Sequence, residues 1–186
     1  MHTDSLETPR LVLRRFRRSD CDALQCIFGD AEVMQYGEGK QDNAWIAGWI
    51  EAQRAEYDNS SRLGALAVIE KSTGDFLGYA GLFVYPDIGG QAEVEIGYRF
   101  AKSQWGRGFA TEAAIVVRDH ALGVLRLPRL IALIDPLHTA SVHVAQKAGF
   151  EYEKAVKIEE HGWIDHVFSI DHALGLGAHG VESKKA

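Results

Sequence analysis

One stretch of this chain, a strand pattern that runs through a glycine-rich turn into a helix, constrains its fold more than any other. Residues 93–100 (EVEIGYRF) alternate as a strand does, and residues 104–113 (QWGRGFATEA) begin a helical pattern. Such a connection points backbone N–H groups and the positive end of the helix at one spot. Gly106 and Gly108 allow a ligand to approach the main chain, and Arg107 can contact a phosphate. The stretch predicts an anion-binding loop, although two glycines can also simply make a tight turn.

Familiar nucleotide and hydrolase motifs do not fit this loop. Residues 106–111 (GRGFAT) lack the third glycine of GxGxxG and follow a β-meander rather than the first strand of a βαβ unit. GxxxxGK[ST] and GxSxG do not occur in the sequence. These observations exclude a P-loop and the commonest serine-hydrolase signature, and they leave a Rossmann-type nucleotide binder as a distant alternative.

The remaining pattern predicts a mixed α/β domain of the α+β type, with a mixed, mostly antiparallel central sheet and helices on both faces. A length of 186 residues suits one domain, which we assign to residues 1–174, followed by a flexible tail at 175–186. We expect Trp45 and Trp49, on the helix that opens at Asp42, to lie in the core. Strands are predicted at 11–13, 63–70, 76–85, 92–100, 129–134, 150–160 and 163–170, and further helices at 19–29, 108–125 and 139–148.

Charge and cysteine content restrict the classes of binding partner and the cellular compartment that we expect for this protein. Lys and Arg total 20 against 26 Asp and Glu, a net charge of −6, which disfavours nucleic acid and favours cationic small molecules or protein termini. The N-terminal residues lack the apolar region of an export signal, and no apolar run approaches ~20 residues, so we expect no membrane segment. Cys21 and Cys26 are interpreted as buried free thiols, which suit a reducing cytoplasm. Without HExxH or a cysteine pair near the histidines, we expect no metal.

Several motifs together resemble a known family. They are residues 95–98 (EIGY), 105–113 (WGRGFATEA), 135–141 (DPLHTAS) and 147–150 (KAGF). In this order they are similar to the GNAT acyl-CoA-dependent N-acetyltransferases. The strand at 10–14 (RLVLR) is similar to the branch that contains the ribosomal-protein N-terminal acetyltransferases.

The resemblance implies a fold and a cosubstrate. The strand ending near Phe100 would splay from the strand at 129–134, with the pantetheine of acetyl-CoA in the opening and its pyrophosphate on the amides of residues 106–111. The cofactor-binding residues so implied are Ile96, Tyr98, Phe100, Trp105, Gly106, Arg107, Gly108, Phe109, Ala110, Thr111, His138, Ser141 and Lys147.

Two positions depart from the family pattern. His138 stands where an asparagine is frequent, so a typical hydrogen bond to the cofactor arm is altered. Ala145 stands where many members carry a tyrosine that protonates the departing thiolate, so that general acid is ruled out at this position.

Amide formation from a thioester needs an uncharged amine and therefore a group that accepts a proton. Glu95 is our candidate base; the alternative is a solvated strand face, which we favour for Glu93. Ser141 is our second candidate catalytic residue, because its hydroxyl can hydrogen-bond the cofactor or the departing sulfur. Its alternative role is helix capping.

We therefore expect an enzyme that moves an acetyl group from acetyl-CoA to a primary amine, with a protein N-terminal α-amine as first choice. The alternatives are a small cationic acceptor such as an aminoglycoside or polyamine, and a non-catalytic acyl-CoA-binding sensor. Loops 34–40 and 161–162 would build the acceptor pocket. Tyr36 and Trp163 are possible members, although we favour a packing role for each. Monomer and homodimer both stay open.

Overall fold

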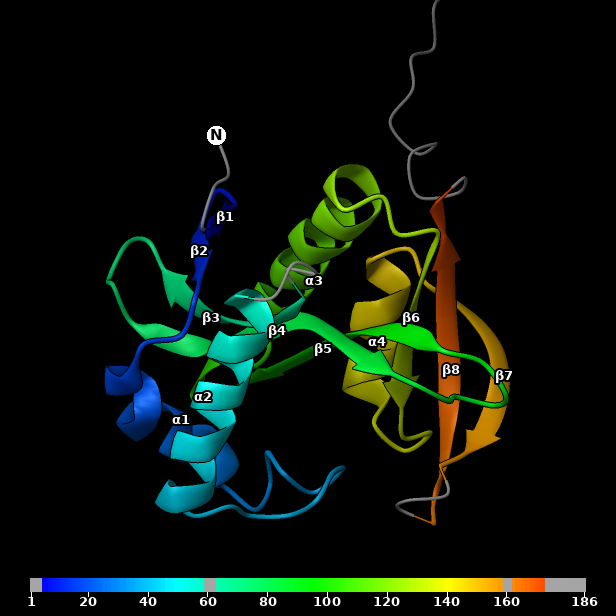
Figure 1. The fold of residues 1–186 in the computed structure, drawn as a ribbon. Helices are drawn as coiled ribbons and strands as arrows, with labels where there is room; N and C mark the ends of the chain where they lie inside the picture. The colour runs from blue at the N-terminus through cyan, green and yellow to red at the C-terminus, as the bar shows by residue number, and fades with distance from the viewer. Residues whose placement is uncertain (1–4, 59–62, 159–161, 173–186) are drawn as a thin grey trace, which may run out of the picture.

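The computed structural model describes residues 5–58, 63–158 and 162–172, which form one sheet flanked by helices (Figure 1). The sheet order is β1-β2-β3-β4-β5-β6-β8-β7. Its strands are β1 (Ser5–Glu7), β2 (Leu11–Arg14), β3 (Gly64–Glu70), β4 (Phe76–Tyr85), β5 (Glu93–Phe100), β6 (Arg129–Ile134), β7 (Glu151–Lys157) and β8 (Ile164–Asp171). The α-helices are α1 (Cys21–Phe28), α2 (Asn43–Asp58), α3 (Phe109–Asp119) and α4 (Thr139–Lys147).

The predicted fold class is confirmed, with local differences at element ends. β4 and β6 have the predicted bounds. The helix predicted at 108–125 is α3 followed by a π-helical turn, His120–Val124. β1 was not predicted, because three residues are too few to show a strand period; its stability comes from pairing with β2. The predicted tail at 175–186 and part of the 161–162 turn lie outside the described residues, so the single-domain assignment stays a prediction.

Helix starts depend on acidic side chains. The helix predicted to open at Asp42 is α2, and Asp42 caps it, since its Oδ1 accepts a hydrogen bond from the Trp45 N–H at 2.8 Å. A 3₁₀ turn, Arg18–Asp20, precedes α1. In this turn Asp20 accepts a hydrogen bond from the Arg17 N–H at 2.8 Å and pairs with both terminal nitrogens of Arg14.

The sheet opens between β5 and β6. All other neighbouring strands are antiparallel over several residues, whereas β5 and β6 run parallel and meet at one pair, Glu95 and Ile131. The expected splay is thus confirmed. Because β6 diverges beyond this pair, the end of β5 leaves main-chain groups facing a gap rather than a neighbouring strand.

Two cores lie on opposite faces of the sheet. In one core, strand residues such as Leu66 and Ile96 pack against α3 and α4. Strand residues that point to the other face, such as Ala65, pack against α1 and α2 in the second core. Ile46 and Ile50 of α2 are buried in the second core. On α1, Cys26 is exposed and Cys21 is only partly buried, so the expected burial of both thiols is wrong. Within the described residues, no helix combines the length and apolarity needed to cross a membrane.

Candidate active site

A cleft of about 900 Å³ occupies the opening of the sheet. β5 and the end of β6 form its middle, the loop from Gln104 to Thr111 and the first turns of α4 line one part, and α1, α2 and residues 33–38 line another. The cleft therefore joins the predicted anion-binding loop to the predicted base on one continuous surface.

The glycine loop has the backbone geometry of an anion site. Gly106 and Gly108 both adopt left-handed conformations, with φ of 74° and 79°, and Gly108 is the N-cap of α3. The first intrahelical bond of α3 runs from the Glu112 N–H to the Gly108 carbonyl at 3.1 Å. The amides of Phe109, Ala110 and Thr111 thus precede the helical hydrogen bonds, and these residues line the cleft. A diphosphate fits such a set of donors.

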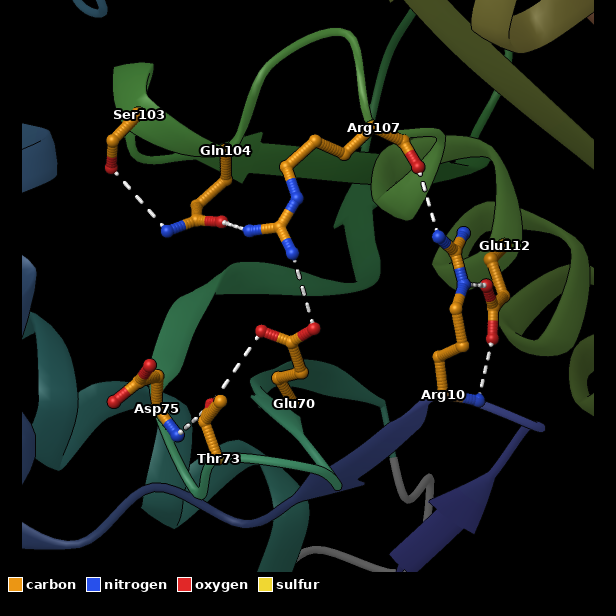
Figure 2. A network of polar contacts seen from close by, with 8 residues as sticks. All are labelled: Arg10, Glu70, Thr73, Asp75, Ser103, Gln104, Arg107 and Glu112. Atoms are coloured by element: carbon orange, nitrogen blue, oxygen red, sulfur yellow. Dashed lines mark hydrogen bonds and ion pairs between the residues drawn. The ribbon is translucent and has the colours of Figure 1, made fainter.

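The Arg107 side chain lies away from the cleft. Its guanidinium donates to Gln104 Oε1 at 2.5 Å and to Glu70 Oε1 at 3.2 Å (Figure 2). The same guanidinium lies over the Phe109 ring. Every other predicted cofactor residue lines the cleft. The side chains of Ile96, Phe100 and Phe109 are buried in the core, so these residues offer the cleft mainly backbone atoms.

A polar network behind the loop was missed from sequence. Arg10 donates to the Arg107 carbonyl at 3.0 Å and to Glu112 Oε2 at 2.6 Å (Figure 2). The Thr8 hydroxyl also donates to Glu112, to Oε1 at 2.5 Å. Partial burial acts to raise the pKa of Glu112, but the hydrogen bonds from Thr8 and Arg10 hold it below its ordinary value. The network ties the start of β2 to the loop and fixes the direction of the Arg107 carbonyl. No local pattern pairs residues about 100 positions apart.

Glu95 lies where the strands part. Its Oε1 accepts the Leu133 N–H of β6 at 3.3 Å. Burial, with a smaller contribution from Asp165, raises its pKa to about 7, against the lowering effect of the hydrogen bonds from Leu133 and Tyr85. A carboxyl group that exchanges its proton near neutral pH suits a general base.

Glu93 has a different role from Glu95. It is buried, against our expectation of a solvated strand face, and lies 3.1 Å from Arg129 Nε in an ion pair. β5 therefore carries one structural carboxylate and one that faces the cleft.

Tyr98 and Ser141 meet across the gap between β5 and α4. The Tyr98 hydroxyl lies 3.1 Å from both the Oγ and the carbonyl oxygen of Ser141. The N-cap of α4 is His138, so Ser141 does not cap the helix, and its hydroxyl is paired with Tyr98 instead. Burial raises the pKa of Tyr98 to about 12, so this phenol keeps its proton.

His138, the N-cap of α4, also lines the cleft. Burial first, and the Arg99 charge second, lower its pKa. Its ring lies 4.4 Å from that of Tyr36, whose hydroxyl is 3.5 Å from the Leu137 carbonyl. Tyr36 and Trp163 both line the cleft, so each is placed where it can contact an acceptor.

The part of the cleft near α1 and α2 is aromatic. Trp45 is 37% exposed there, so its expected place in the core is wrong, whereas Trp49 packs partly buried against the second core. The spacing of α2 places both tryptophans on one helix face but does not show that α1 leaves the outer one uncovered. The other aromatic residues lining this part are Phe28, Tyr79, Phe83 and Tyr85. In the described part of the chain, no three His, Cys, Asp or Glu side chains gather where they would hold a metal ion.

Comparisons with known proteins agree with this geometry. Residues 10–151 match the family model described as "Acetyltransferase (GNAT) domain". The "Uncharacterized protein YkkB" of Bacillus subtilis (strain 168) is 36% identical over 154 residues, covering 82% of this chain and 88% of that protein.

Solved structures show the same fold. An acetyltransferase (GNAT family) from Bacillus anthracis has a TM-score of 0.79 at 24% identity, covering 91% of this chain and 99% of that one. RimL, a "Ribosomal L7/L12 alpha-N-protein acetyltransferase" solved in complex with Coenzyme A, has a TM-score of 0.74 at 14% identity, covering 90% and 97%.

Proposed function

This chain belongs to the GNAT family and is an N-acetyltransferase, and from that premise we propose that it transfers the acetyl group of acetyl-CoA to a primary amine. Our first choice of acceptor is the α-amine of a protein N-terminus. We also propose that it acts in the cytoplasm, which suits the free thiols of Cys21 and Cys26.

The glycine loop would hold the cosubstrate. The amides from Gly106 to Thr111 would take the pyrophosphate, and the space above Gly106 is open, since a Cβ there would meet no atom within 4 Å. The pantetheine arm would enter the gap between β5 and β6, past Tyr98. The RimL structure with Coenzyme A supports this assignment through the shared fold.

Glu95 would take the proton of the amine. As the amine nitrogen attacks the thioester carbonyl, a C–N bond forms and the C–S bond breaks. The ammonium proton goes to the Glu95 carboxylate, directly or through a water molecule. Main-chain N–H groups freed by the splay are suited to polarise the carbonyl oxygen.

Ser141 would support the leaving group. Its hydroxyl can donate a hydrogen bond to the thiolate sulfur, and Tyr98, 3.1 Å from Ser141 Oγ, orients that hydroxyl. A thiolate leaves readily, so no dedicated acid is required at Ala145.

The observation that carries this proposal is that one cleft joins the glycine loop to a carboxyl group with a pKa of about 7. The test is an acetylation assay with acetyl-CoA on a panel of peptide N-termini and an amine library that includes polyamines and aminoglycosides, with products identified by mass spectrometry. The net charge of −6 favours the small cationic amines as second candidates. Acetylated peptides are expected; binding of acetyl-CoA without turnover of any amine would indicate a sensor instead.

A further inference from the structure

Arg99 lines the cleft, and its guanidinium forms no ion pair with a carboxylate in the part of the chain that the structure describes. Arg99 is partly buried, and its Nη1 lies 3.0 Å from Met34 Sδ, a weak acceptor. None of the ion pairs found among residues 5–58, 63–158 and 162–172 involves it. Arg99 is partly withdrawn from water, and although its charge lowers the pKa of Glu95, the two groups form no ion pair, so part of the desolvation cost of the guanidinium stays uncompensated. A bound anion would offset that cost.

β5 places Arg99 and Glu95 on one face with an aromatic floor between them. Arg99 pairs in register with Tyr79 of β4, and Glu95 with Phe83. A Cβ at Gly97 would lie 2.7 Å from Phe83 Cε2, so the missing side chain lets the Phe83 ring lie over the strand between the two charged residues. This floor can receive a flat apolar group but offers it no hydrogen bond.

The Glu95 carboxyl group and the Arg99 guanidinium lie toward opposite ends of this aromatic floor. Asp165 and Tyr85 accompany Glu95 at the acidic end. Met34 and Gly37 accompany Arg99 at the other end, where a Cβ at Gly37 would lie 3.1 Å from the guanidinium. Four residues along a strand span about 13 Å at ~3.3 Å per residue.

From this arrangement we infer that the acceptor is an amine that also carries an anionic group, a carboxylate or phosphate, at the far end of a flat apolar body. The amine would approach Glu95, the body would lie on Phe83, and the anion would pair with Arg99. This inference rests on the proposed function and specifies its acceptor. The chemistry can come from a small aromatic amino-carboxylate or from a peptide N-terminus with an acidic residue near it, and it disfavours polyamines, which would bring cations to Arg99.

The test compares acceptors that differ only in the far group. Two matched pairs are 4-(aminomethyl)benzoate with 4-(aminomethyl)benzamide, and the C-terminally amidated peptides Ala-Phe-Glu and Ala-Phe-Gln; spermidine is the cationic probe. Hydrogen bonds to charged groups contribute about 1.5–3 kcal/mol, so the anionic member should have a kcat/KM about 10- to 100-fold higher. Whichever pair shows the difference identifies the source of the acceptor.

Substitutions at Arg99 test whether this residue causes the preference for anionic acceptors. Arg99→Met should raise KM for the anionic acceptor to that of its neutral partner with little change in kcat, and Arg99→Lys should restore part of the preference. Arg18→Met is the matched control, because Arg18 is an arginine with an 80% exposed side chain that pairs with Glu51 outside the cleft. Calorimetric binding of acetyl-CoA verifies that each variant is folded.

The outcomes separate the two proposals. If wild type acetylates neutral members or spermidine as well as the anionic ones, or if Arg99→Met slows all acceptors equally, the inference is overturned and the proposed acetyl transfer stands. If acetyl-CoA binds but no probe and no amine of the wider library is acetylated, the proposed function itself fails.

Discussion

Replacing Glu95 by glutamine should stabilise the fold in alkaline solution while removing most of the turnover. Burial raises the pKa of Glu95 from an ordinary 4.5 to about 7, a difference equivalent to about 3 kcal/mol at ~1.36 kcal/mol per pKa unit. The folded state thus binds this proton more tightly than the unfolded chain does. The stabilisation from the proton is complete below pH 4.5 and is lost as the pH rises through 7. Glutamine is neutral throughout and can still accept the Leu133 N–H.

Thermal unfolding at two pH values measures this effect. For a domain of this size 1 kcal/mol corresponds to about 2–4 °C in Tm, so Glu95→Gln should exceed wild type by up to ~6–12 °C at pH 8 and by much less at pH 5. Loss of a general base should lower kcat by about 10²–10⁴-fold. The rise of kcat/KM with pH near 7 should disappear with it.

A control substitution on the same strand should change Tm in the opposite direction. Glu93→Gln weakens the buried pair with Arg129 and should lower Tm at pH 8. Equal stability of Glu95→Gln and wild type at pH 8 would refute the argument from burial, and unchanged turnover across pH would refute the role of Glu95 as base.

Three further substitutions test the loop and the tyrosine. Gly108→Ala puts a Cβ on a residue with φ of 79°, costing about 1–2 kcal/mol; calorimetry should show coenzyme A binding weakened by up to about tenfold, and unchanged affinity would contradict the loop's role. Glu112→Ala releases Arg10 from the loop, so steady-state kinetics should show a severalfold higher KM for acetyl-CoA at similar kcat; a fall in kcat alone would count against it. Tyr98→Phe removes the hydroxyl beside Ser141 and should lower kcat up to about tenfold without changing acetyl-CoA affinity, whereas an unaltered kcat would exclude the orienting role.

Backbone features of the site follow from local sequence. Two glycines at 106 and 108 predict the left-handed turn because few other residues adopt positive φ without strain. Strand alternation places Glu95 and Arg99 on one face. The start of α2 was also predictable from local sequence, because Asp42 caps the helix through the N–H of Trp45, only three residues further along.

Side-chain partners between distant residues do not follow from local sequence. Arg107 has the charge to bind phosphate, yet Glu70, 37 positions away, and Gln104 receive its hydrogen bonds. Whether Trp45 is covered depends on how α1 packs beside α2, and the environment of Glu95 depends on where β6 leaves β5. Such contacts are set by how the elements pack against one another, which the periodicity of each single element does not determine.

The two-residue period of β5 connects the cosubstrate and acceptor halves of the proposed mechanism. Ile96 and Tyr98 face α3 and α4, where the loop amides and Ser141 lie, whereas Glu95 and Arg99 lie on the opposite face of the strand. A slip of one residue would exchange the two sets and put both charges into the apolar core. The extended antiparallel register with β4 prevents that slip, so the single pair with β6 can leave the gap open without loosening the strand. The opening thus gives access from both faces to one strand, which is what direct transfer between two bound substrates requires.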